Sequence, residues 1–134
     1  MKKFVALIGL AVSAAVCAHA AAVPTIYTSQ QAANGQAVFT QNCASCHGSD
    51  LQGGVGPMLI GQDFAAASAN NTIGKIFTFL STQMPEGNGG SLTHTQYEDA
   101  MAYILSKNGY PAGTAKLDYA KAKASTIPLI SQVK

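Results

Sequence analysis

The stretch that decides the fold is Cys43-Ala44-Ser45-Cys46-His47, a C-x-x-C-H motif in a chain of 134 residues. This pattern is the signature of covalent c-type haem attachment. Two cysteines three positions apart can reach both vinyl groups of a porphyrin and form thioethers, and the adjacent histidine then directs its imidazole to the iron. The motif therefore predicts one haem c, attached through Cys43 and Cys46, with His47 as an axial ligand.

Three other uses of the motif are open from the sequence. A structural zinc site needs two further ligands, and only His94 remains beyond the motif once the N-terminal segment is set aside. A thioredoxin-like redox pair requires a βαβ context, which the sequence pattern lacks. A disulfide between Cys43 and Cys46 would leave His47 without a role. Haem attachment is favoured because it uses all three side chains.

The N-terminal segment is predicted to be a secretory signal peptide, residues 1–20. It begins with two lysines, continues with an apolar run over residues 4–16 and reaches a small-x-small site at residues 18–20. The run is short for a membrane span, which needs about 20 residues. A retained anchor and a lipid on Cys17 are the alternatives, but the branched Val16 does not suit a lipidation site. We expect cleavage after residue 20 and a periplasmic protein.

Removal of this segment changes the totals that bear on function. The whole chain has a formal charge of +2, three cysteines and no arginine. The mature part keeps six lysines and six acidic residues, so its formal charge is zero, and its two cysteines are those of the motif. This balance gives no support for nucleic-acid binding, which clustered Lys and Arg would indicate. It also provides little long-range steering toward a partner.

Composition and apolar spacing together predict an all-α fold with three main helices. The composition of residues 29–42, which includes a face of small residues, favours the first helix, and Ser29 is its predicted N-cap. Apolar residues recur at i, i+3, i+4 and i+7 over residues 73–80, and the same spacing returns over residues 97–105 behind a capping box that starts at Thr93. No segment alternates with a period of two, so no sheet is predicted.

Two glycine-rich segments, residues 48–61 and 83–90, have no regular period and are predicted to be loops. A long loop in a compact domain is usually functional. The narrow apolar stripes leave a thin core, which a cofactor would fill. We expect residues 21–113 to form one domain around this cofactor. Residues 114–134 are expected to be a C-terminal tail that packs on the domain or extends from it, with a short helix near residues 117–124.

Met84 is the predicted second axial ligand. It lies in an irregular loop, and the proline that follows it stiffens the chain. Met101 lies on the apolar stripe of the last helix, where core packing explains it better. Met58 follows His47 too closely to reach the opposite face of the ring. His94 is in the first turn of a helix, where an exposed position is expected.

These features together resemble a class I c-type cytochrome of the bacterial exported type, and the resemblance covers most of the mature chain. Gly35 and Phe39, which precede the motif, resemble the first-helix contacts of that family. Ala100 and Tyr103 match the last-helix positions that cross them. The resemblance implies that residues 21–113 form a cytochrome c domain, with a cytochrome c-like fold in which three main helices and their loops wrap around one haem.

Two further motifs carry the resemblance. Gly56-Pro57-Met58-Leu59 is similar to the family's Gly-Pro-x-Leu, which implies that the carbonyl of Pro57 accepts a hydrogen bond from His47 and orients the imidazole. Met84-Pro85 followed by Gly90-Ser91-Leu92 resembles the distal methionine loop. The chain departs from the family in having no Arg or Trp to hold the haem propionates, and in a distal loop that is unusually rich in glycine.

The predicted ligand set leads to a functional expectation. Imidazole on one face and a thioether on the other leave no open position on the iron, so we expect an electron carrier that is not an enzyme. Its partners would be redox proteins such as a periplasmic dehydrogenase or a terminal oxidase, and we expect a monomer outside such a complex. The alternatives are a haem c subunit of such a complex and, less favoured, a gas sensor or peroxidase-like protein in which Met84 detaches.

Overall fold

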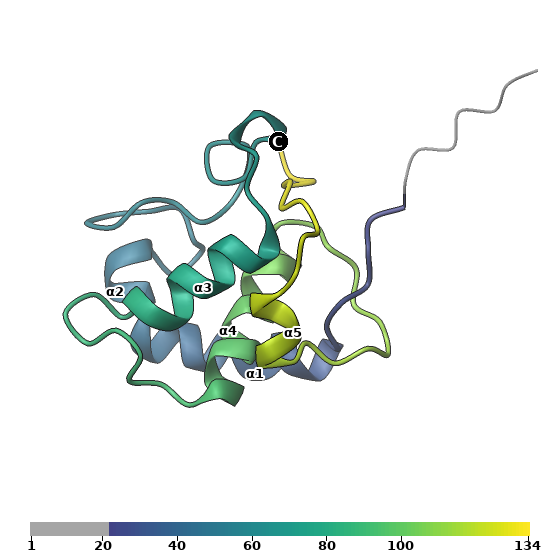
Figure 1. Ribbon diagram of the computed structural model, residues 1–134. Coiled ribbons are helices and arrows are strands. Elements are labelled where there is room, and N and C mark those ends of the chain that lie inside the picture. Colours follow the sequence, from purple (N-terminus) through teal and green to yellow (C-terminus); the bar gives the residue numbers. More distant parts are fainter. Residues whose placement is uncertain (1–21) are drawn as a thin grey trace, which may run out of the picture.

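The structure is a computed structural model that describes residues 22–134, so the predicted signal peptide lies outside the described residues. Within that range the chain is helical, with one isolated β-bridge and no strand. The predicted all-α fold is confirmed (Figure 1). The elements in chain order are α1 (Ser29–Asn42), α2 (Ala44–His47), a 3-10 turn (Ala67–Ala69), α3 (Ile73–Gln83), α4 (His94–Lys107) and α5 (Tyr119–Lys123).

Capping boxes set the start of two helices. The N-cap of α1 is Thr28, so the prediction of Ser29 was wrong by one residue. Thr28 has an extended backbone, its hydroxyl accepts from the amide of Gln31 at 3.2 Å, and the Gln31 side chain accepts from the amide of Thr28 at 3.3 Å. This reciprocal pair satisfies two amides that the helix itself leaves free. The box predicted from Thr93 is present, with Gln96 as its partner.

Helices α1 and α4 form the most extensive helix pair, and Gly35 lies where their backbones come into close contact. A Cβ atom at position 35 would collide with the backbone carbonyl of Asp99 and lie 2.9 Å from the Cβ of Tyr103. One turn further along α1, the centroid of the Phe39 ring lies 5.4 Å from the centroid of the Tyr103 ring. Ala100 of α4 is also buried. The helix crossing that the resemblance implies is therefore present, and at this crossing the backbone of α4 packs directly against Gly35 of α1.

The C-terminal tail packs on α3 and α4. Its side chains Leu117, Ala122 and Leu129 are buried in one apolar cluster with Ile73 of α3. The amide of Ile73 donates to the carbonyl of Ile127 at 2.9 Å, so the tail also satisfies the backbone at the start of α3. Figure 1 shows α5, in yellow, beside α4.

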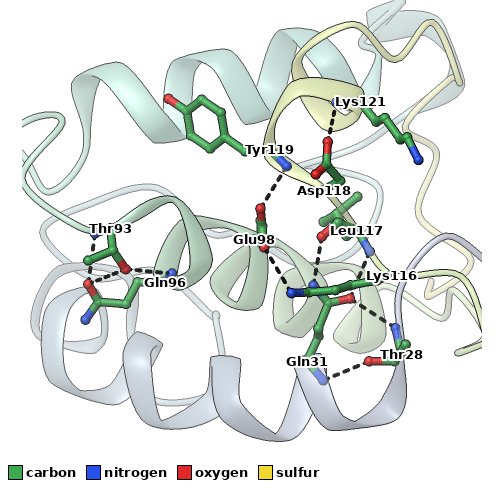
Figure 2. Close-up of polar contacts among 10 residues, drawn as sticks. All are labelled: Thr28, Gln31, Thr93, Gln96, Glu98, Lys116, Leu117, Asp118, Tyr119 and Lys121. Atoms are coloured by element: carbon green, nitrogen blue, oxygen red, sulfur yellow. Dashed lines mark hydrogen bonds and ion pairs between the residues drawn. The ribbon is translucent and has the colours of Figure 1, made fainter.

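Polar side chains of α1 and α4 bind this tail through hydrogen bonds and an ion pair, as Figure 2 shows. The amide group of Gln31 on α1 bonds both the N–H and the carbonyl of Leu117, each at 2.9 Å. Glu98 on α4 accepts from the amide of Tyr119 at 2.8 Å and pairs with Lys116 at 3.9 Å. Loss of the tail would leave Gln31 with only its bond to Thr28 and would remove both of these partners of Glu98, which is costly because the two side chains are buried.

Asp99 is buried beside the α1–α4 crossing, and its ionisation lowers the free energy of unfolding in a pH-dependent way. Desolvation raises the pKa of its carboxyl and Glu98 acts in the same direction, against lowering contributions from Asn34 and Lys116. Because the pKa of this carboxyl is higher in the folded state, the group loses its proton more readily in the unfolded chain. The free energy of unfolding therefore falls as the pH rises above the pKa of the unfolded state, about 3.9. We expect Asp99→Asn to raise the melting temperature at pH 7, with the gain vanishing near pH 3. Melting curves at both values test this, and an equal gain at both pH values would contradict it.

No helix in the described part of the chain combines the length and the apolar character needed to cross a membrane.

Candidate functional site

A cavity of about 530 Å³ lies between the C-x-x-C-H motif, the glycine-rich loop, α3 and the loop that follows α3. This volume is within the roughly 300–1,000 Å³ that is typical of cofactor sites. Apolar side chains from α1, α3, α4 and the loop line much of it, among them Phe39, Leu59, Phe64, Ile76, Leu80 and Ile104. The structure brings all five predicted site residues to this lining: Cys43, Cys46, His47, Pro57 and Met84.

A break between two helices places the motif. Helix α1 ends at Asn42, and Cys43 is both the C-cap of α1 and the N-cap of α2. The amides of Cys46 and His47 donate to the carbonyl of Cys43 at 3.1 and 3.0 Å, which closes a tight turn. The turn holds two sulfur atoms and an imidazole at one wall of the cavity.

The imidazole of His47 is oriented by the glycine-rich loop. Its Nδ1 lies 2.7 Å from the carbonyl oxygen of Pro57, which can only accept, so Nδ1 carries the proton and Nε2 keeps a free lone pair. A Cβ at Gly56 would lie 3.0 Å from Cε1 of the ring, so the loop can approach this closely because residue 56 is glycine. A histidine held in this way is prepared to bind a metal through Nε2.

The two cysteines are free thiols, Cys43 partly buried and Cys46 exposed. Burial raises the pKa of Cys43 to about 11, with a further contribution from Cys46. Redox-active C-x-x-C pairs have a lowered pKa, so this environment differs from that of a thioredoxin-like site. Within residues 22–134, no group of three or more His, Cys, Asp or Glu side chains could hold a metal ion.

Met84 directly follows α3 and is half-buried at the cavity. Its peptide bond to the next residue, Pro85, is cis. Met58 lines the same cavity, whereas Met101 is fully buried in the core and His94 is exposed on α4 with its ring stacked on Tyr119. Of the four candidates for the second axial position, the structure thus brings two methionines to the cavity.

Sequence reasoning did not identify several residues of this site. Asp63 and Glu86 line the cavity, and no lysine of the described chain does. Both lie in irregular segments whose path the local sequence does not specify. Tyr97 donates its hydroxyl to the backbone carbonyl of Met84 at 2.7 Å. In the sequence, Tyr97 shows only the helical spacing of a core residue.

Three comparisons relate this chain to known proteins. Residues 30–104, more than half of the chain, match the family described as cytochrome c oxidase, cbb3-type, subunit III. A thiosulfate dehydrogenase from Stutzerimonas stutzeri strain A1501 is 35% identical over 81 residues, which is 55% of this chain and 26% of that protein. The sulfane dehydrogenase SoxCD from Paracoccus pantotrophus matches in structure with a TM-score of 0.55 and 27% identity, over 73% of this chain and 52% of that chain.

The chain therefore spans about a quarter of one relative and about half of the other. The matched family segment includes the C-x-x-C-H motif, Pro57 and Met84. With a helical cytochrome c-like fold and more than half of its sequence inside the family match, the chain belongs to the c-type cytochromes of the family described as cytochrome c oxidase, cbb3-type, subunit III.

Proposed function

We propose that this protein carries single electrons between redox proteins by means of one haem c. Thioethers to Cys43 and Cys46 would attach the haem, and His47 and Met84 would be its axial ligands. The observation that carries the proposal is the 2.7 Å contact between His47 Nδ1 and the carbonyl of Pro57, in a cavity that both thiols and Met84 also line. A covalently attached haem uses all of these groups together.

When bound, the haem would supply an iron centre that alternates between the ferric and ferrous states. The protein's own residues set the conditions for that exchange. The carbonyl of Pro57 accepts the Nδ1 proton of His47, which would leave Nε2 available to the iron as a neutral donor. The apolar lining would disfavour the extra charge of the ferric state, and the soft thioether of Met84 would raise the reduction potential.

The remaining assignments extend this proposal to the whole chain. Residues 1–20 would be removed on export to the periplasm, and residues 21–113 would form the haem domain. The tail, residues 114–134, would belong to the same folded unit, which its buried contacts with α1 and α4 support. With both axial positions filled by protein side chains, the chain would act as a carrier and not as an enzyme.

A second candidate function is that of a haem subunit in a dehydrogenase complex. It is favoured by the two relatives, whose names describe dehydrogenases of thiosulfate and sulfane sulfur and which are longer than the matched segments. The partner would then be a dehydrogenase of inorganic sulfur compounds. Gel filtration of native periplasmic extract distinguishes the two functions, because a complex predicts comigration with a larger dehydrogenase and a free carrier predicts elution near the size of the mature chain.

An absorption spectrum of the purified protein tests the haem proposal. We expect a pyridine haemochrome typical of two thioethers, and haem that stays on the chain in a denaturing gel. Cys43→Ser and Cys46→Ser should each shift the haemochrome, because one vinyl group then stays unsaturated. Ser45→Ala, between the two cysteines, is the matched control and should leave it unchanged. Haem that acidified acetone extracts from the wild-type protein would contradict covalent attachment.

A further inference from the structure

We propose that Tyr97 is a positioning residue that holds Met84 at the cavity by joining the two ends of the distal loop, residues 84–92. The inference rests on the proposed role of Met84 as an axial ligand. The side chain of Tyr97 is 1% exposed, and its hydroxyl donates to the carbonyl of Met84 at 2.7 Å. The same oxygen accepts from the amide of Leu92 at 3.4 Å. One buried hydroxyl thus contacts the first and the last residue of the loop.

The loop packs on the end of α3 at Gly89 and on the apolar cluster at Leu92, but its own backbone hydrogen bonds do not reach α4. Residues 86–91 are exposed, and the backbone bonds of this stretch, from Asn88 to Pro85 and from Ser91 to Asn88, stay inside the loop. The amide of Met84 donates back to α3, at 3.2 Å from the carbonyl of Leu80. Among the described hydrogen bonds, those of the Tyr97 hydroxyl are the ones that tie this loop to α4.

Helix α4 holds the Tyr97 hydroxyl in a fixed position, because the start of the helix is capped and the Tyr97 ring is buried. It begins with the capping box of Thr93 and Gln96, immediately before Tyr97. The ring of Tyr97 is packed in the main apolar cluster with Phe77 and Met101. A methionine side chain has three rotatable bonds and adapts easily, so the position of its backbone limits where its sulfur can go. Fixing the Met84 carbonyl to α4 therefore restricts how far the thioether can leave the cavity.

The experiment measures how readily an external ligand displaces Met84 in the ferric holoprotein, with imidazole as the probe. Tyr97→Phe removes the hydroxyl and keeps the ring. We expect the apparent affinity for imidazole to rise about fivefold, the factor that a typical net hydrogen bond contributes to an equilibrium. The thioether-to-iron charge-transfer band should weaken in the same variant, which a purely structural role for the hydroxyl would not cause.

Tyr110→Phe is the matched control. Tyr110 is also buried, and its hydroxyl likewise donates to one backbone carbonyl, of Pro128 at 3.1 Å, and accepts from one amide, of Ile130 at 2.9 Å. Neither tyrosine lines the cavity, and the two partners of the Tyr110 hydroxyl lie outside the distal loop. We expect a similar fall in melting temperature for the two variants, but imidazole affinity within twofold of wild type for Tyr110→Phe.

Equal changes in imidazole affinity for Tyr97→Phe and Tyr110→Phe, or no change for Tyr97→Phe, would overturn the positioning role. Met84→Ala separates this result from failure of the proposed function. If Met84→Ala abolishes the charge-transfer band, Met84 is the ligand, and the two tyrosine variants decide about Tyr97. If the band is absent from the wild type or survives Met84→Ala, the ligand assignment fails and the positioning proposal fails with it.

Discussion

Replacement of Met84 by histidine is expected to lower the reduction potential of the holoprotein by on the order of 0.2 V, within the roughly 0.8 V range over which axial ligands set haem potentials. The thioether is a soft donor that stabilises ferrous iron, whereas a second imidazole stabilises the ferric state. Spectroelectrochemical titration measures the shift. The ferric variant should also lose the thioether-to-iron charge-transfer band.

Met58→His is the matched control for this prediction. Met58 is the other methionine on the cavity lining and is 38% exposed. It follows Pro57, whose carbonyl contacts His47, so we expect it on the side of the cavity where His47 already lies. The potential of Met58→His should stay close to that of wild type. A fall in potential in this variant, with Met84→His unchanged, would show that the second axial ligand had been assigned to the wrong methionine.

Gly35→Ala is expected to reduce the free energy of unfolding by about 3 kcal/mol, at the upper end of what overpacking usually costs. At an exposed helical position the same change would stabilise the protein by about 1 kcal/mol, because alanine is the better helix former. Here the new methyl group collides with the carbonyl of Asp99, and backbone cannot rotate away as a side chain can. The two helices must separate, which disturbs the contact of Phe39 with Tyr103.

Denaturant titration of the holoprotein measures this loss. Ala37→Gly is its control, since Ala37 is exposed on the same helix and the change runs in the opposite direction. It should cost about 1 kcal/mol, from helix propensity alone. If Gly35→Ala proved as stable as the wild-type protein, the close approach of α1 and α4 would not be what requires glycine at this position.

Local patterns in the sequence predicted much of this fold. The spacing of apolar residues and the capping box at Thr93 are features of neighbouring residues, and they predicted α3 and α4, whereas composition predicted α1. The short helix of the tail was also predicted, and it begins behind Asp118 as its N-cap. The error at Ser29 is also local, because two adjacent residues can both cap a helix and the extended backbone of Thr28 decides between them.

The sequence by itself determined the class of fold, the C-x-x-C-H motif and membership of a c-type cytochrome family, because these depend on residue types at short, fixed spacings. Only the tertiary structure decided which residues meet across long separations. The carbonyl of Met84 accepts a hydrogen bond from Tyr97. The buried side-chain amide of Gln31 bonds both the N–H and the carbonyl of Leu117, 86 residues away. Such pairs form when packing buries polar groups that must then be satisfied, and no local pattern specifies which element will come to satisfy them.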